Sequence, residues 1–175
     1  MAGYRTTLIN IINEVKATVV AEVGVHTGYL TDTLCTRCIS IKEYYAVDPW
    51  MEYSGVGAGT LAKITQKQWD AHYQNVKARE KLYPFLKVIR ATSKDAAQMF
   101  KDGYFDVVFI DADHSYESAK EDMQLWLPKI RKGGVLCGHD YCRRYPGVVQ
   151  AYKEVFGQED KPKASVWSWK AGGEN

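Results

Sequence analysis

Acidic side chains follow two apolar segments of this chain, at the positions where each segment would end as a β-strand. Asp111 comes directly after the most apolar segment, 105–110, and Asp140 follows the segment 135–138. The carboxyl ends of parallel strands meet at one edge of a sheet, so the two carboxylates are expected to lie close together. With a polar neighbour they would provide the oxygen ligands that Mg²⁺ or Mn²⁺ prefers. The spacing therefore predicts a divalent-cation site at this edge.

A second group of residues has the arrangement of a nucleotide-binding turn. An apolar run ending at Ala21 leads into Glu22, Gly24 and Gly28, and Asp48 follows twenty residues after Gly28, at the end of the next predicted strand. A strand, a tight glycine turn and the start of a helix form the place where an open α/β sheet holds a nucleotide-like ligand. A carboxylate at Asp48 can accept both hydroxyl protons of a ribose. The pattern predicts a ligand that contains adenosine.

The spacing of the turn, E-x-G-x-x-x-G, indicates which adenosine ligand fits. A turn that binds a dinucleotide pyrophosphate has three glycines, as G-x-G-x-x-G. Here Val25 stands beside Gly24, and the bulky Tyr29 follows Gly28. The acidic Glu22 suits a cationic ligand group better than a phosphate. S-adenosylmethionine carries adenosine, a sulfonium and an ammonium and has no phosphate, so these residues favour it over a dinucleotide.

Segments with strand and helix patterns alternate along the chain and would position these groups. The predicted strands are 18–21, 44–47, 86–89, 105–110, 135–138 and 166–169. Apolar spacing predicts helices within 1–16, 30–41, 65–83, 93–102, 119–130 and 146–156. Thr65 with Gln68 forms a capping-box pattern, and Ser93 is expected to cap its helix. Right-handed crossovers then give an α/β fold in one domain, 1–175, with a doubly wound, mostly parallel sheet and an antiparallel last strand.

The bulk properties exclude several classes of partner. The 175 residues carry a net charge of +2 without a basic run, so nucleic-acid binding is not expected. The longest apolar stretches are strand-sized and the N-terminus lacks a signal-peptide core, so no membrane span is expected. Cys35, Cys38, Cys137 and Cys142 are expected to be reduced thiols in a cytoplasmic protein, although a zinc site is the alternative.

The segment 49–64 follows directly on Asp48 and contains three glycines within 55–59. Such a run is too flexible for regular structure and adjoins a predicted site residue. It is therefore predicted to be a mobile lid, and the alternative is a loose connection.

Two longer motifs carry a resemblance to a known family. They are Phe109-Ile110-Asp111-Ala112-Asp113-His114-Ser115-Tyr116-Glu117 and Gly133-Gly134-Val135-Leu136-Cys137-Gly138-His139-Asp140-Tyr141. With the turn and Asp48, they resemble the small class I S-adenosylmethionine-dependent methyltransferases over roughly residues 18–156. The most similar group contains metal-dependent O-methyltransferases of sugars and catechol-like substrates. The resemblance implies a Rossmann-like methyltransferase fold.

The resemblance also implies roles for individual residues. The expected cofactor-binding residues are Glu22, Gly24, Val25, His26, Thr27, Gly28, Asp48, Pro49, Ser93, Lys94 and Asp111. Among these, Ser93 and Lys94 would flank the adenine. Asp111 and Asp140 would ligate Mg²⁺ or Mn²⁺. His139, which replaces a more usual acidic residue, would be a further ligand, and the alternatives are a different metal or none. His114 stands where catechol-like members have a lysine base, and an imidazole with an intrinsic pKa near 6.5 can take that role.

The implied reaction is an in-line methyl transfer to a small hydroxylated acceptor, in which the metal-bound hydroxyl loses its proton to His114. The aromatic residues Trp50, Tyr53, Trp167 and Trp169 would form a stacking wall for the acceptor, and core packing is the alternative for these rings. A homodimer would complete that wall. Two other functions remain open: a nucleoside-binding module without chemistry, and another enzyme class on the same scaffold, such as an oxygenase or an NAD-binding enzyme.

Overall fold

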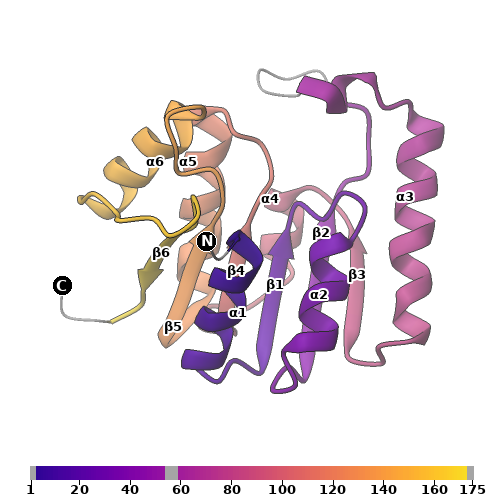
Figure 1. Ribbon diagram of the computed structural model, residues 1–175, viewed down its shortest axis with the longest axis horizontal. Helices are drawn as coiled ribbons and strands as arrows, with labels where there is room; N and C mark the ends of the chain where they lie inside the picture. Colours follow the sequence, from indigo (N-terminus) through magenta and orange to yellow (C-terminus); the bar gives the residue numbers. More distant parts are fainter. Residues whose placement is uncertain (1–2, 54–58, 173–175) are drawn as a thin grey trace.

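A six-stranded sheet forms the centre of the computed structural model, which describes residues 3–53 and 59–172 (Figure 1). The strands are β1 (Val19–Val23), β2 (Glu43–Asp48), β3 (Leu86–Arg90), β4 (Phe105–Ile110), β5 (Ile130–Gly138) and β6 (Trp167–Lys170), in the spatial order β3-β2-β1-β4-β5-β6. All neighbouring pairs are parallel except β5 and β6, which are antiparallel. The predicted doubly wound sheet with an antiparallel last strand is therefore confirmed.

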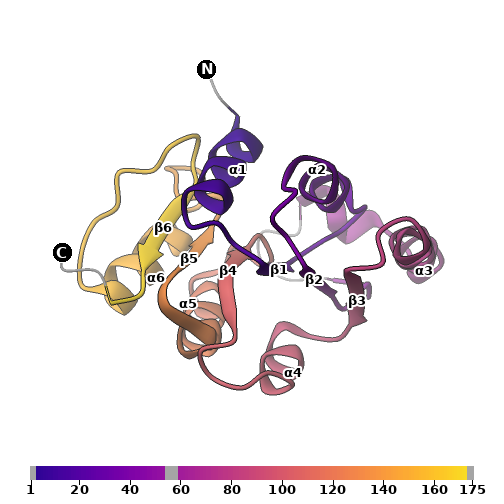
Figure 2. The ribbon, with the colours of Figure 1, turned by 90° about the horizontal axis from the view of Figure 1, so that it is seen from below.

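Helices cover both faces of this sheet (Figure 2). One face carries α1 (Tyr4–Glu14), α2 (Tyr29–Arg37) and α3 (Gln66–Ala78), and the other carries α4 (Ser93–Gln98), α5 (Tyr116–Trp126) and α6 (Pro146–Phe156). Single 3₁₀ turns lie at Gly59–Lys63, Arg79–Lys81 and Leu127–Lys129. None of the helices described is long and apolar enough to cross a membrane.

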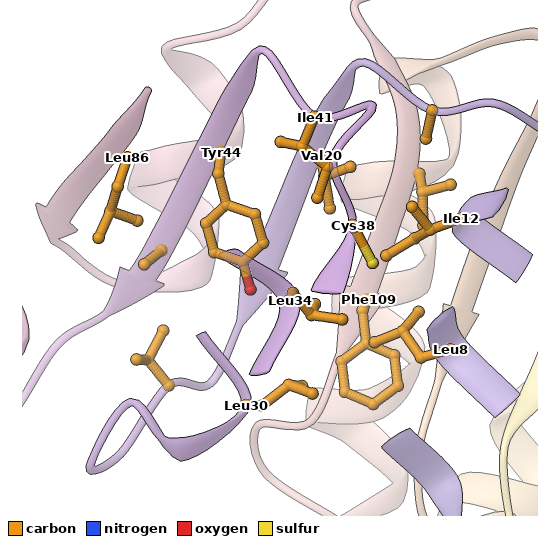
Figure 3. Close-up of a cluster of buried hydrophobic side chains, with 14 of the residues drawn as sticks. Leu8, Ile12, Val20, Leu30, Leu34, Cys38, Ile41, Tyr44, Leu86 and Phe109 are labelled. Carbon is orange, nitrogen blue, oxygen red and sulfur yellow. The ribbon is translucent and has the colours of Figure 1, made fainter. Parts of the chain in front are cut away.

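The core consists of two apolar layers, one on each side of the sheet. In the layer under α1 and α2, Leu8, Ile12 and Leu34 lie close to Val20 and Phe109, and all five side chains are fully buried (Figure 3). Burial of each such side chain contributes roughly 1.5–3 kcal/mol. Every residue of β4 is buried, as expected for a central strand that is covered on both faces. This packing fixes the strand ends on which the site is built.

Local signals fix some element boundaries and misplace others. The capping box at α3 is confirmed, because the Thr65 backbone N–H donates to Gln68 Oε1 at 2.9 Å. The expectation that Ser93 caps α4 is wrong: Thr92 is the cap, since its Oγ1 accepts from the Asp95 backbone N–H. Likewise, β5 begins at Ile130, well before the glycine pair that was expected to open it, with a register shift against β4.

Candidate active site

The carboxyl ends of β1 and β4 lie side by side where the strand order reverses, which is the point where open α/β sheets bind ligands. Here the turn after β1 touches the loop after β4. A Cβ on Gly24, whose φ is +92°, would lie 2.1 Å from the Asp111 carbonyl oxygen. Only glycine permits both this approach and this backbone angle. The predicted turn and the predicted metal ligand Asp111 therefore meet at one rim.

Asp48 holds the backbone of two loops at this rim. Its Oδ2 accepts from the backbone N–H groups of Val25 and His26, both at 2.9 Å, and its Oδ1 accepts from the Trp50 N–H at 2.7 Å. His26 and Trp50 have positive φ angles of 53° and 41°, conformations that cost free energy without such support. A carboxylate offers about four acceptor positions, so about one remains for a ribose hydroxyl, not two.

The Glu22 side chain contacts α2 and β2. Its carboxyl is buried and its Oε2 accepts from the Thr31 hydroxyl at 2.6 Å and the Tyr44 hydroxyl at 2.5 Å. Burial raises the pKa of this carboxyl to about 8, against the opposing effect of the two hydroxyl donors. Direct contact between Glu22 and a methionine group stays a prediction, whereas its support of α2 and β2 is visible in these bonds.

The buried Glu22 carboxyl predicts a pH dependence of stability. Its pKa is raised on folding from an ordinary value of 4.5, so its favourable contribution is complete below pH 4.5 and is lost as the pH rises towards 8. Glu22→Gln cannot ionise and keeps an oxygen acceptor. We expect it to raise the free energy of unfolding at pH 9, relative to the wild type, by on the order of 3 kcal/mol.

Urea denaturation of both proteins between pH 5 and pH 9 measures this difference. The exposed Glu117, replaced by glutamine, is the matched control and should leave the profile unchanged. Parallel profiles for the wild type and Glu22→Gln would show that Glu22 titrates normally.

Two carboxylates and two imidazoles gather beside the turn. One ligand atom from each of Asp111, His139 and Asp140 can be chosen so that all three lie within 4.8 Å of one another. His114 Nε2 lies 2.6 Å from Asp140 Oδ2 and 3.8 Å from Asp111 Oδ1. The structure thus brings together the residues that the sequence assigned to metal binding and proton transfer. Their side chains are 15 to 27% exposed, so a ligand can reach them.

These groups shift one another's pKa values strongly. Hydrogen bonds and charge from Asp111 and then Asp140 raise the pKa of His114 to about 9, although burial opposes this. Burial also opposes the rise in the pKa of His139, which the same two carboxylates bring to about 10. Conversely, the two histidines hold the pKa of each aspartate below its usual value despite burial. With both carboxylates facing it, the His114 ring is therefore protonated at neutral pH and cannot accept a proton.

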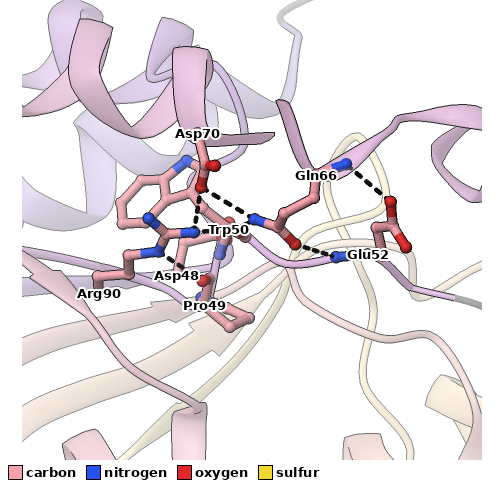
Figure 4. Close-up of polar contacts among 7 residues, drawn as sticks. All are labelled: Asp48, Pro49, Trp50, Glu52, Gln66, Asp70 and Arg90. Atoms are coloured by element: carbon pink, nitrogen blue, oxygen red, sulfur yellow. Dashed lines mark hydrogen bonds and ion pairs between the residues drawn. The ribbon is translucent and has the colours of Figure 1, made fainter. Parts of the chain in front are cut away.

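The segment after β2 is anchored to α3 and β3 (Figure 4). Arg90 donates to the carbonyls of Pro49 and Trp50 at 3.3 and 2.8 Å, and the Gln66 side chain also donates to Trp50 O. Glu52 and Gln66 bind each other's backbone N–H groups through their side chains. Positions 49–52 of the predicted lid are thus held in place. Residues 54–58, at its centre, lie outside the described residues, so the lid stays a prediction.

Comparison with known proteins supports the resemblance seen in the sequence. Residues 21–141 match the family described as "Methyltransferase domain". The chain belongs to this family. A curated relative, the uncharacterized protein y4gI of Sinorhizobium fredii, is 26% identical over 127 residues, which are 69% of this chain and 13% of that protein. This methyltransferase domain thus corresponds to a small part of that relative.

Solved structures share the fold of this methyltransferase domain. The O-methyltransferase NovP has a TM-score of 0.69 at 16% identity, with 94% of this chain and 76% of NovP covered. An O-methyltransferase from Bacillus cereus, solved in complex with SAH, has a TM-score of 0.64 at 19% identity, with 87% of this chain and 68% of that chain covered. The fold is therefore that of the class I O-methyltransferases.

Several of the remaining predicted cofactor residues already have protein partners. The Ser93 hydroxyl accepts from Trp126 Nε1 at 2.9 Å, and Lys94 pairs with Glu121 at 3.0 Å. The Thr27 carbonyl accepts from Arg79 at 3.0 Å. Their contacts with an adenosine ligand stay predictions.

The predicted aromatic wall is wrong for two of its members. Trp50 and Trp167 are 0 and 1% exposed and belong to the core. Trp169 stacks on Phe156 of α6, with ring centroids 5.5 Å apart, so its ring is also used in packing. These tryptophans follow the alternative of core packing, because their large apolar rings fill gaps beside the sheet.

Two tyrosines that the sequence did not indicate lie against the histidines of the candidate site. The Tyr4 ring lies 4.6 Å from the His139 ring, and the Tyr145 ring stacks on His114 at 4.4 Å with an interplanar angle of 26°. Tyr145 could have been suspected from its place shortly after Asp140. No local signal indicated Tyr4, because it reaches the site from a helix more than a hundred residues away in the chain.

Proposed function

We propose that this methyltransferase domain transfers a methyl group from S-adenosylmethionine to a hydroxyl oxygen of a small acceptor, such as a sugar or a catechol-like ring. The observation that carries the proposal is the convergence of the glycine turn, Asp48 and the Asp111–His139–Asp140 cluster at one sheet edge. The SAH bound to the Bacillus cereus relative, the demethylated form of this cofactor, supports the choice of ligand.

The donor set fits a divalent cation. Asp111, His139 and Asp140 supply two carboxylates and an imidazole within 4.8 Å of one another, and their partial exposure leaves room for further oxygen ligands. Carboxylates suit Mg²⁺ and Mn²⁺ alike, and an imidazole favours Mn²⁺ of the two. Such a cation would act as a Lewis acid and lower the pKa of an acceptor hydroxyl.

In the proposed reaction, the protein mainly supplies alignment and proton transfer. The acceptor oxygen attacks the methyl carbon, the sulfur–carbon bond breaks, and the electron pair stays on sulfur to give S-adenosylhomocysteine. The hydroxyl proton passes to His114. This requires a neutral ring, and the pKa of His114 falls towards its ordinary value once Asp111 and Asp140 direct their charge to another cation.

Calorimetry with S-adenosylhomocysteine, NADH and ATP tests the proposal directly. Of the three ligands, we expect only S-adenosylhomocysteine to bind saturably, and this binding should be retained in EDTA. Methyl transfer to hydroxylated acceptors should need Mg²⁺ or Mn²⁺. Binding of NADH without S-adenosylhomocysteine would instead identify a dinucleotide enzyme. Binding of S-adenosylhomocysteine with no transfer to any hydroxyl acceptor, even with metal present, would indicate a nucleoside-binding module.

The assembly and location of the protein belong to the same proposal. β6 is one of the two edge strands of the sheet, and we propose that a second copy of the chain closes the acceptor side. Sedimentation velocity measures whether such a homodimer forms. All four cysteines are free, and a cytoplasmic location stays a proposal.

A further inference from the structure

We propose that Arg5 binds a carboxylate group at the rim of the candidate active site, an inference that rests on the proposed function for the identity of the ligand. Arg5 is the second residue of α1. The N-terminal end of this helix lies at the same end of the molecule as the carboxyl ends of β1 and β4 (Figure 1). None of the motifs in the sequence includes this residue.

Aromatic contacts place Arg5 between the two halves of the site. Its guanidinium carbon lies 4.4 Å from the centre of the Tyr29 ring and 5.7 Å from that of Tyr4. Tyr29 begins α2 directly after the glycine turn at Gly28. Tyr4 lies against the ring of His139. Arg5 therefore adjoins both the predicted cofactor turn and the predicted metal cluster.

The charges around Tyr4 support this location. Burial and the negative charge of Asp111 raise the pKa of the Tyr4 hydroxyl, whereas the positive charge of Arg5 lowers it. One hydroxyl thus responds to both the Asp111 carboxylate and the Arg5 guanidinium. The location of Arg5 itself rests on its distances to the Tyr4 and Tyr29 rings and on the contact of Tyr4 with His139.

Within the described residues no salt bridge involves Arg5, Arg37, Arg143 or Arg144, and of these four Arg5 is the one that contacts both Tyr4 and Tyr29. Arg79, Arg90 and Arg131 each pair with an aspartate. Within residues 3–53 and 59–172, no carboxylate or carbonyl accepts a hydrogen bond from Arg5, which is half-buried. The contact between the Arg5 guanidinium and the Tyr29 ring involves no carboxylate or carbonyl acceptor. The guanidinium N–H groups are left for a planar carboxylate, which arginine binds in bidentate fashion.

Two ligands of the proposed reaction can carry such a carboxylate. One is the amino-acid end of S-adenosylmethionine, which would lie near the glycine turn. The other is an acceptor that bears an acid group next to its hydroxyl. Both present the same chemistry to Arg5, so the experiment uses one pair of ligands for each source.

The first arm compares S-adenosylhomocysteine with 5′-methylthioadenosine, which lacks the amino acid, by calorimetry on the wild type and Arg5→Gln. If the cofactor supplies the carboxylate, the variant binds S-adenosylhomocysteine about tenfold or more weakly, the range of a charge-assisted hydrogen bond, and binds 5′-methylthioadenosine equally well. The second arm compares 3,4-dihydroxybenzoate with catechol, added to the protein saturated with S-adenosylhomocysteine and Mn²⁺. If the acceptor supplies the carboxylate, only dihydroxybenzoate binding is lost.

Two further variants complete the test. Arg37→Gln removes an exposed arginine from the C-terminal end of α2. It should change neither the ratio of the affinities for S-adenosylhomocysteine and 5′-methylthioadenosine nor the ratio for 3,4-dihydroxybenzoate and catechol. Arg5→Lys keeps the positive charge and should keep part of the preference for the ligand that carries a carboxylate. Thermal unfolding checks that both Arg5 variants are folded. If the wild type binds all four ligands and Arg5→Gln changes neither ratio, Arg5 is not a carboxylate-binding residue. A wild type that binds no S-adenosylhomocysteine overturns the proposed function as well.

Discussion

Asp140→Asn is expected to lower kcat/KM for methyl transfer by about 10²- to 10³-fold, the effect of losing several kcal/mol of transition-state stabilisation by a metal. Asp140 is one of the three proposed metal ligands and the group that lies 2.6 Å from His114 Nε2. The amide keeps the shape of the side chain but removes its charge. Metal affinity should fall with turnover, whereas the affinity for S-adenosylhomocysteine should change by less than about threefold.

Initial rates with saturating Mn²⁺ and calorimetry with S-adenosylhomocysteine measure the two effects separately. Asp102→Asn provides a matched control, because the Asp102 side chain is 72% exposed and pairs with Lys129. Full turnover by Asp140→Asn, or equal turnover of the wild type in EDTA, would rule out metal-assisted transfer.

Gly24→Ala is expected to reduce the free energy of unfolding by about 3 kcal/mol or more and to abolish cofactor binding. The new methyl carbon would lie 2.1 Å from the Asp111 carbonyl oxygen, and a φ of +92° is also unfavourable for alanine. Because the obstructing atom belongs to the backbone of the loop after β4, no side-chain rotation relieves the clash. The turn and this loop must therefore separate.

Urea denaturation and calorimetry with S-adenosylhomocysteine measure both consequences. Gly157→Ala is the matched control: Gly157 has a φ of +67°, but a Cβ there meets nothing within 4 Å. This substitution should lower the free energy of unfolding only by the roughly 1–2 kcal/mol that a left-handed backbone conformation costs alanine, and it should leave ligand binding unchanged. Similar losses for the two variants would show that the close approach at Gly24 contributes nothing.

The strand pattern and the strand ends were predictable because they depend on local sequence. The apolar segment that became β4 could only be a covered central strand, and its end placed Asp111 at the rim. From the order of the strands, Asp140 followed on the adjacent end. The proximity of Asp111 and Asp140, the candidate metal ligands, was therefore predictable from the sequence.

Side-chain directions and contacts between distant segments were not predictable in this way. Glu22 ends inside the core because Tyr44, twenty-two residues later, supplies a hydroxyl there. Tyr4 reaches His139 only because α1 packs across the sheet. For the cap of α4, Thr92 and Ser93 are equivalent in sequence, and the backbone path after β3 decides between them.

A single carboxylate, that of Asp48, ties the turn after β1 to the residues after β2. Much of the entropy of ordering these two loops is therefore lost when the chain folds, before any nucleoside arrives. A ligand then meets a preorganised backbone, and its association should proceed without a slow rearrangement of this part of the rim.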